Sequence, residues 1–198
     1  MNQISFLLLL LVIYLIAAIP TGLVLARVLG GEDVREKGSG NIGATNVYRV
    51  AGKAAGVLTL LGDISKGLLP LLAVQLWLEP TATQLGIAGA TAIVGHCYPV
   101  YLCFKGGKGV ATALGIFLVL SAKAVAGAVL VFILTVALTR YISLGSILAA
   151  LSAPLFVLLL AEPDPILVAT CFIAVLVVWR HRANIQRLLS GEESRFKA

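Results

Sequence analysis

Long apolar runs repeat along the whole chain, and they constrain its fold more than any other feature. The first run, residues 4–26, contains no charged side chain over 23 positions, and about 20 apolar residues are enough to cross a bilayer as a helix. Hydrophobic residues make up 60% of the 198 residues and charged residues 12%, whereas soluble domains carry about 25% charged residues. The sequence therefore predicts an all-α, polytopic integral membrane protein that folds as one domain over residues 1–198.

Seven apolar runs are predicted as transmembrane helices, at residues 4–26, 54–78, 82–104, 110–122, 124–139, 143–161 and 166–179. The stretch 110–139 could form one long helix or two short helices that break near Lys123. We favour two helices, because seven spans place nearly all Lys and Arg residues on one side, as is typical of the cytoplasmic side of a membrane protein. This arrangement predicts an extracytoplasmic N-terminus and a cytoplasmic C-terminus.

Four polar segments lie on the predicted cytoplasmic side, at residues 27–53, 104–110, 139–146 and 180–198. Because the other side has only short turns, we expect the chemistry of this protein to lie at the cytoplasmic face. The last segment is a short basic tail. The net charge of +6 follows the same positive-inside bias and does not predict a nucleic-acid partner.

The first polar segment contains the sequence GSGNIGATNVYR, which begins at Gly38 and ends at Arg49. Glycines let main-chain N–H groups converge on an anion, and the guanidinium of Arg49 fits phosphate. A dinucleotide-binding fold is not predicted, because the charged stretch 31–37 is no strand; an ordinary turn capped by Ser39 or Thr45 remains the alternative. The candidate substrate-binding residues here are Ser39, Gly40, Asn41, Gly43, Thr45, Asn46 and Arg49.

The second polar segment contains GHCYPVYLCFKGGKGVAT, from Gly95 to Thr112. It differs from a P-loop, because Gly109 stands where Ser or Thr would follow the lysine. Lysines among glycines before a helix N-terminus still predict an anion site, although lysines that snorkel to the headgroups are the alternative. The candidates are Lys105, Gly106, Gly107, Lys108, Gly109 and Thr112, with His96 as either a catalytic or a structural histidine.

The third and fourth segments add polar side chains at helical spacing. Ser143 and Ser146 lie three residues apart, on one face of the predicted helix. They are predicted to bind substrate, and the alternative is that they are small residues at which two helices pack. His181, Asn184 and Arg187 recur at the same spacing, and the alternative is a basic tail held on anionic lipid. In the second run, Asp63 and Lys66 are predicted to form an ion pair within their helix.

Several site types are missing from the sequence. No cluster of acidic residues for Mg²⁺ lies on the cytoplasmic side, and no His and Cys set suits zinc, so we expect neither a metal nor a cofactor. The three cysteines are scattered, which argues against disulfides. There is no G-x-S-x-G elbow, and Tyr101 and Gln186 stand where a His-x-x-x-x-Asp motif would need Asp.

At these motifs the sequence resembles the acylphosphate:glycerol-3-phosphate acyltransferases, the bacterial PlsY family. GSGNIGATN with Arg49 is similar to the family's first motif, GHCYPVYLCFKGGKGVAT to its second and RHRANIQRLL to its third, and the RYISLGSI stretch fits as well. The resemblance covers essentially the whole chain. It implies a seven-helix enzyme of the bacterial inner membrane that transfers a fatty acyl group from acyl phosphate to glycerol 3-phosphate, giving lysophosphatidic acid and phosphate.

The resemblance and the charges together suggest roles for the candidates. Both substrates carry phosphate, and the donor also needs an apolar groove in contact with membrane lipid. The expected catalytic residues are Arg49, His96, Lys108, His181 and Asn184, and the expected acyl-phosphate contacts include Lys105, the 106–109 loop, Asn41, Thr45 and Ser146. We expect a monomer. The alternative function is a transporter of small phosphorylated anions, although transporters usually bind at the midplane between inverted repeats, and no repeat is visible.

Overall fold

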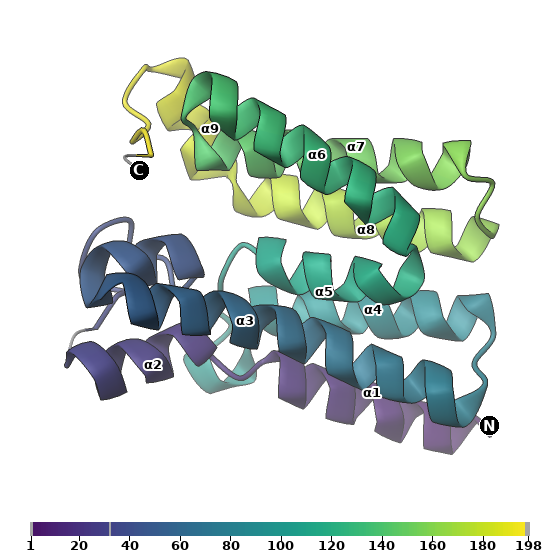
Figure 1. Cartoon of the computed structure of the whole chain (residues 1–198). Helices are drawn as coiled ribbons and strands as arrows, with labels where there is room; N and C mark the ends of the chain where they lie inside the picture. Colours follow the sequence, from purple (N-terminus) through teal and green to yellow (C-terminus); the bar gives the residue numbers. More distant parts are fainter. Residues whose placement is uncertain (1, 32, 197–198) are drawn as a thin grey trace.

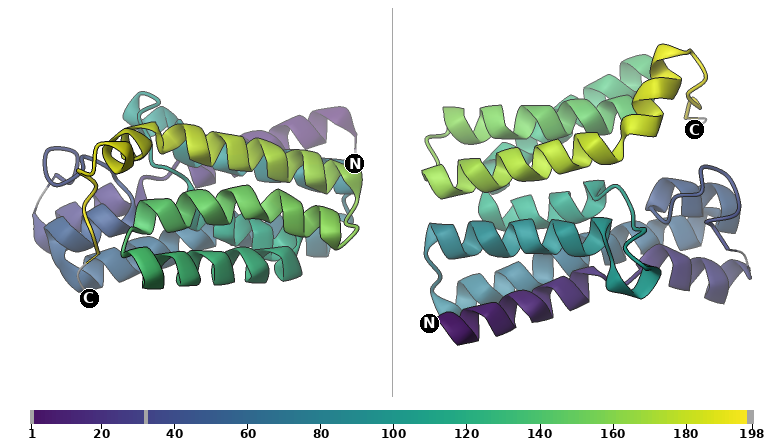
Figure 2. Two further views of the ribbon diagram at one scale, coloured as in Figure 1. Left: turned by 90° about the horizontal axis from the view of Figure 1, so that it is seen from above. Right: turned by 180° about the vertical axis from the view of Figure 1, so that it is seen from behind.

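The computed structural model describes residues 2–31 and 33–196 and contains only helices over these residues. Figures 1 and 2 show the helices running side by side in two groups. The first group holds α1 (Gln3–Ala17), α2 (Thr21–Gly30), α3 (Ala44–Leu78), α4 (Ala82–Cys97) and α5 (Val110–Leu120). The second holds α6 (Ala122–Thr139), α7 (Ile142–Leu159), α8 (Asp164–Arg180) and α9 (Arg182–Leu189), and a short 3₁₀ turn, Val100–Leu102, follows α4. The predicted all-α membrane class is confirmed.

The helix lengths refine the prediction of seven spans. Five stretches are long and apolar enough to cross a membrane alone, at Gln3–Gly30, Ala44–Leu78, Ala82–Leu102, Ala122–Thr139 and Ile142–Leu159. The pair α8 and α9, bent by 57°, is a sixth candidate if the two helices count as one broken span rather than a re-entrant loop. The seventh apolar helix, α5, has 11 residues and reaches only about 16 Å, half of a hydrocarbon core about 30 Å thick.

Proline residues account for two differences from the predicted runs. The run 4–26 is broken at Ile19 and Pro20, because a proline cannot donate to the helix and disfavours helical geometry in the residue before it. The freed Ile19 carbonyl accepts a hydrogen bond from Lys66 Nζ at 2.8 Å. The run 82–104 ends as a helix at Cys97, two residues before Pro99.

Two further breaks shape the site. The predicted break near Lys123 lies at Ser121, whose backbone is extended and whose hydroxyl accepts a hydrogen bond from Ala124 N–H to begin α6. Within α3, Gly52 has φ 89° and ψ 175°, a conformation open essentially to glycine alone. The segment 44–51 is therefore set at an angle to 53–78.

The ion pair predicted within the second apolar run is confirmed, with Lys66 Nζ 2.8 Å from Asp63 Oδ1.

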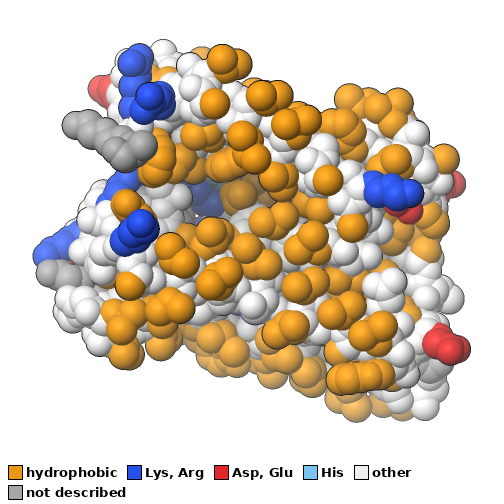
Figure 3. Space-filling view, in the orientation of Figure 1, with side chains coloured by type: hydrophobic (Ala, Val, Ile, Leu, Met, Phe, Trp, Pro, Cys, Tyr) orange, Lys and Arg blue, Asp and Glu red, His pale blue; other side chains and the backbone are white. Residues whose placement is uncertain are grey.

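The two ends of the bundle differ in charge. Most of the Lys and Arg side chains in Figure 3 gather at the end that carries α2 and α9, and most of the acidic ones lie at the other end. The two termini lie at opposite ends of the bundle (Figure 1). This asymmetry fits the positive-inside bias, and the cytoplasmic location of the cationic end stays a prediction.

Candidate functional site

The loop before α3 is organised around one buried side chain, Asn46. Its Nδ2 donates to the carbonyls of Val34, Lys37 and Asn41, and its Oδ1 accepts from the Ser39 amide at 2.8 Å. Both ends of this amide are thus occupied, and the side chain is 2% exposed. Asn46 therefore shapes the loop that carries Ser39, and its predicted contact with substrate stays a prediction.

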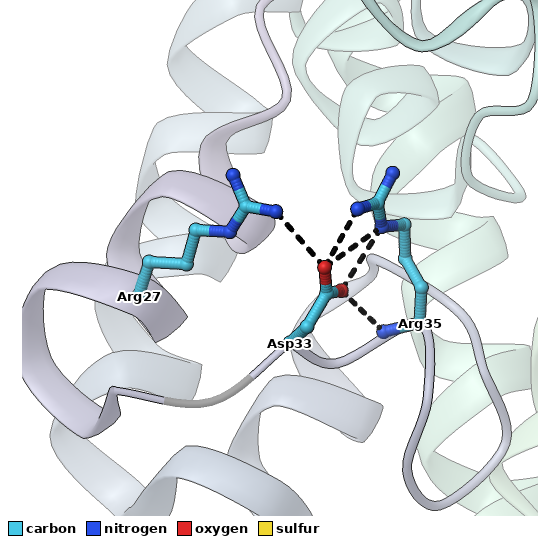
Figure 4. A network of polar contacts seen from close by, with 3 residues as sticks. All are labelled: Arg27, Asp33 and Arg35. Carbon is cyan, nitrogen blue, oxygen red and sulfur yellow. Dashed lines mark hydrogen bonds and ion pairs between the residues drawn. The ribbon is translucent and has the colours of Figure 1, made fainter.

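A carboxylate fastens the beginning of the same loop to α2. Asp33 accepts hydrogen bonds from Arg27 Nη2 at 2.9 Å and from the Arg35 side chain, with the shorter contact at 2.6 Å, as Figure 4 shows. The Arg35 hydrogen bonds hold the pKa of Asp33 well below its usual range. Asp33 therefore stays ionised, and two of the cations near the site are committed to this contact.

Arg49 lies in the segment 44–51, after the loop and before the break at Gly52. Its side chain is exposed, as is Ser39, whereas Asn41 and Thr45 are half-buried. Asn41 Oδ1 accepts the Gly43 amide at 2.8 Å, which leaves its Nδ2 for another acceptor. The exposed guanidinium of Arg49 is thus available to an anion at this end of the bundle.

Gly106 and Gly107, which were predicted to bind an anion through their main-chain N–H groups, pack closely against the end of α4. The amides of Gly106 and Gly107 donate to the carbonyls of Cys97 and His96, each at 3.2 Å, so they cannot also bind an anion. A Cβ at Gly106 would collide with the His96 carbonyl oxygen, and one at Gly107 with His96 Nε2. These two glycines are required by close packing, and these contacts favour a structural role over the predicted anion nest, which stays a prediction.

Gly109 has another role, because its φ of +84° starts α5 from the left-handed region. The adjacent Lys108 is half-buried and lies at the N-terminal end of α5. A helix N-terminus favours negative charge. The part of this motif that remains suited to an anion is therefore Lys108 with the first turn of α5, which includes the buried Thr112.

His96 lies behind the glycine loop. Its Nδ1 is 3.0 Å from Thr112 Oγ1 and 3.8 Å from Asp63 Oδ1, and the residue is 3% exposed. The ring also packs against Gly107. These contacts favour the structural alternative for His96 over the catalytic role, because its ring supports the loop from the side away from solvent.

His181, at the bend between α8 and α9, is better placed to handle a proton. Its Nδ1 lies 2.8 Å from the Val177 carbonyl oxygen. A carbonyl can only accept, so Nδ1 carries the hydrogen and Nε2 of the neutral ring is left as an acceptor. The pKa of His181 is lowered to about 4, chiefly by burial; the Val177 hydrogen bond opposes burial, and Lys108 lowers and Glu193 raises the pKa by smaller amounts.

Glu193 joins the fourth segment to the third, a link that the sequence analysis missed. Its carboxylate accepts from Ser143 Oγ at 2.7 Å, from Asn184 Nδ2 at 2.6 Å and from Arg187 Nε at 2.7 Å. Burial raises the pKa of Glu193, but these three hydrogen bonds outweigh burial and the net pKa lies below the usual value. The tail is thus folded onto the site, where the ionised carboxylate holds α7 and α9 together.

The same contact fixes how Asn184 is oriented. A carboxylate accepts only, so the Nδ2 group must face Glu193 and the carbonyl oxygen must face away. This oxygen, Asn184 Oδ1, is buried and has no hydrogen-bond partner among the described residues. A buried unpaired acceptor is costly, and here it presents a place for a donor such as a hydroxyl group. Ser146, by contrast, already donates to the Ile142 carbonyl at 2.8 Å.

Lys108 is the electrostatic centre of the site. The pKa of Lys108 is lowered to about 8: burial lowers it most, Glu193 opposes burial, and Arg187, Arg49 and Arg180 add smaller downward effects. Cations from the first and the fourth polar segments therefore act electrostatically on one lysine of the second. Figure 3 shows the surface hollowed at this end, between the two groups of helices, with Lys or Arg atoms inside the hollow and apolar side chains along it.

Arg180 is a second residue that the sequence analysis did not single out. It donates to the carbonyls of Gly107 and Gly106, at 2.9 Å and 2.6 Å, and its guanidinium lies 5.3 Å from the centre of the Tyr98 ring. Lys105 is exposed on the same loop.

Within residues 2–31 and 33–196, no three His, Cys, Asp or Glu side chains come together as a metal site would require.

Known proteins match this chain over nearly its full length. The family profile for glycerol-3-phosphate acyltransferases matches residues 7–191. The glycerol-3-phosphate acyltransferase of Syntrophotalea carbinolica is 60% identical over 195 residues, which cover 98% of this chain and 99% of that protein. The protein of the same description from Trichlorobacter lovleyi is 55% identical over 187 residues, with coverage of 93% and 94%.

Two crystal structures of PlsY, an integral membrane glycerol 3-phosphate acyltransferase, have the same fold. The glycerol 3-phosphate form is 43% identical, with a TM-score of 0.91 and coverage of 98% of this chain and 96% of that chain. The lysophosphatidic acid form is 41% identical, with a TM-score of 0.88. The resemblance inferred from the motifs is thereby confirmed, and this chain belongs to the glycerol-3-phosphate acyltransferase (PlsY) family.

Proposed function

We propose that this protein transfers a fatty acyl group from acyl phosphate to glycerol 3-phosphate, giving lysophosphatidic acid and inorganic phosphate. The reaction is the first acylation of bacterial phospholipid synthesis, at the cytoplasmic face of the inner membrane, by a monomer without metal or cofactor. The observation that carries this proposal is a hollow at the cationic end of the bundle with Lys or Arg atoms inside it (Figure 3), together with the effect of Arg49 and Arg187 on the pKa of the half-buried Lys108. The relatives crystallised with glycerol 3-phosphate and with lysophosphatidic acid support the acceptor and the product.

Glycerol 3-phosphate is assigned to the side of the site formed by Ser39, Arg49, Lys108, His181 and Asn184. Its phosphate pairs with Arg49 and Lys108, since charge-assisted contacts to phosphate are the strongest available here. The unpaired Asn184 Oδ1 accepts a hydrogen bond from a glycerol hydroxyl. One end of the molecule is thereby held by charge and the other by a single oriented acceptor.

Acyl phosphate is assigned to Lys105, the first turn of α5 after Gly109, Asn41 and Thr45. The amides of Gly106 and Gly107 are excluded because they are already bonded. The acyl tail lies along the apolar part of the hollow between the two groups of helices. Ser146 is assigned to the same group, and it has to turn its hydroxyl hydrogen from the Ile142 carbonyl to donate to the phosphate.

The chemistry is a direct transfer. The glycerol oxygen attacks the acyl carbon, the bond from that carbon to the phosphate oxygen breaks, and the phosphate leaves with the electron pair. The hydroxyl proton passes to the donor's phosphate or to His181 Nε2, and Lys108 with the α5 N-terminus stabilises the developing negative charge. No covalent enzyme intermediate is needed, because acyl phosphate is already activated.

The proposed function is tested with detergent-purified protein supplied with acyl phosphate. We expect release of inorganic phosphate that depends on glycerol 3-phosphate and matches the lysophosphatidic acid formed. Initial rates should follow a sequential pattern, because both substrates meet in one site. Parallel ping-pong lines with a trapped acyl-enzyme would contradict direct transfer, and uptake of glycerol 3-phosphate by proteoliposomes without phosphate release would favour a transporter.

The pH dependence of the reaction reports on Lys108. Only the protonated amine pairs with phosphate, and its pKa lies at about 8, so we expect kcat/KM for glycerol 3-phosphate to fall above about pH 8, by about tenfold per pH unit. Lys108→Arg keeps its charge at this pH, and its kcat/KM, although lower, should lose this decline. An identical decline in Lys108→Arg would assign it to another group.

A further inference from the structure

We propose that Arg180 is a positioning residue, which clamps the loop 105–109 so that Lys108 and the start of α5 meet the substrates in a fixed geometry. The inference deepens the proposed function and rests on it for the reaction. Arg180 ends α8 and is half-buried. It is the residue before His181, so the clamp connects the second motif to the third.

The hydrogen bonds of Arg180 hold two consecutive peptide groups. Its Nη2 donates to the Gly106 carbonyl at 2.6 Å and its Nε to the Gly107 carbonyl at 2.9 Å. A trans peptide is planar and its C=O and N–H point in opposite directions. The first peptide group is therefore held from both sides, by Arg180 at its oxygen and by the His96 carbonyl at the Gly107 amide.

The second peptide group joins Gly107 to Lys108. Because Arg180 holds its carbonyl, the Lys108 amide points away from Arg180 and its direction is fixed. Glycine places few limits on φ and ψ, so a loop with Gly106, Gly107 and Gly109 has little stiffness of its own. The side chain of Arg180 supplies the stiffness that the glycines lack.

Arg180 is itself held in place by an aromatic ring. Its guanidinium lies 5.3 Å from the centre of the Tyr98 ring, a cation–π distance, and Tyr98 lies in the turn after α4. Its neighbour Arg182 provides a contrast, since its side chain is exposed and lies 5.4 Å from the Trp179 ring. The two arginines are alike in charge and in aromatic contact, but of the two it is Arg180 that the structure shows bound to the loop.

The test compares three variants: Arg180→Ala, Arg180→Lys and the control Arg182→Ala. A small displacement of reacting groups costs about 10²-fold in rate, so we expect kcat of Arg180→Ala to fall by about this factor, and the KM for glycerol 3-phosphate to rise because Lys108 pairs with its phosphate. Arg180→Lys keeps the charge but cannot bridge two carbonyls in a fixed fork. Its kcat should lie between that of the wild type and that of Arg180→Ala. Added methylguanidinium should restore part of the activity of Arg180→Ala, and Arg182→Ala should match the wild type.

Amide hydrogen exchange gives a readout that does not depend on turnover. Peptides that cover 103–110 should exchange faster in both Arg180 variants and at the wild-type rate in Arg182→Ala. Unchanged exchange, or faster exchange with wild-type kcat, would overturn the proposal. If the wild-type protein itself releases no phosphate, the proposed function fails, whereas the exchange comparison still decides whether the clamp exists.

Discussion

Replacing Lys108 by alanine is expected to lower kcat/KM by about 10²–10³-fold. In the proposed mechanism, the variant loses the charge that pairs with phosphate and stabilises the leaving group. The free energy of unfolding of Lys108→Ala should not be lower than that of the wild type. Because the folded protein lowers the pKa of Lys108 to about 8, it binds this proton less tightly than the unfolded chain does, so removing the amine removes an unfavourable charge.

The matched control for this experiment is Lys123→Ala, in the first turn of α6. Lys123 is exposed, and Ser121 just before it bonds Glu162 in the turn between α7 and α8, at the end of the bundle far from the site. We expect wild-type turnover from the control, with thermal unfolding measured on both variants in detergent. Near-normal turnover in Lys108→Ala would remove the lysine from the proposed mechanism.

Replacing Gly107 by alanine is expected to disturb both folding and turnover. The added Cβ would collide with His96 Nε2, a ring that is buried between Thr112 and Asp63 and cannot move aside. Overpacking of this kind costs about 1–3 kcal/mol, so the unfolding temperature should fall together with kcat/KM. Unfolding followed by tryptophan fluorescence and turnover on the same sample measure the two effects.

Gly31→Ala separates collision from backbone strain. Gly31 has φ +65°, and no atom lies within 4 Å of the position that an added Cβ would take, so its substitution introduces strain without a collision. We expect turnover near the wild-type value there. If Gly107→Ala instead unfolded at the wild-type temperature with only a raised KM for glycerol 3-phosphate, the anion-nest interpretation of the sequence would be right after all.

The sequence predicted those features that depend on local pattern. Apolar runs of sufficient length must form helices in a membrane, so the helices were found, and Asp63 and Lys66 were paired because they stand three residues apart. The breaks at Pro20 and Gly52 also have local signals, but the prediction treated both residues as parts of continuous segments. Their effect on the direction of the chain became clear only in three dimensions.

Other features depend on contacts between distant segments. The fold of the tail places Glu193 against Ser143, 50 positions away, and Arg180 reaches Gly106 across 74 positions, and neither spacing has a periodic signal. The glycine motif illustrates a different limit. The sequence identifies the positions where a side chain is not tolerated, but not whether the excluded neighbour is a ligand or another part of the protein.

The shortness of α5 has a consequence for the energetics of a lipid-handling enzyme. The residue after α5, Ser121, bonds Glu162 at the end of the bundle far from the site, and α5 covers only about half of the hydrocarbon thickness; we therefore expect the loop with Lys108 to lie below the headgroup level. Lifting an acyl chain into water costs about 0.8 kcal/mol for each methylene. With the reacting groups at this depth, the acyl chain can stay among the lipid tails throughout the reaction. The small polar acceptor, glycerol 3-phosphate, is then the substrate that has to move to the site.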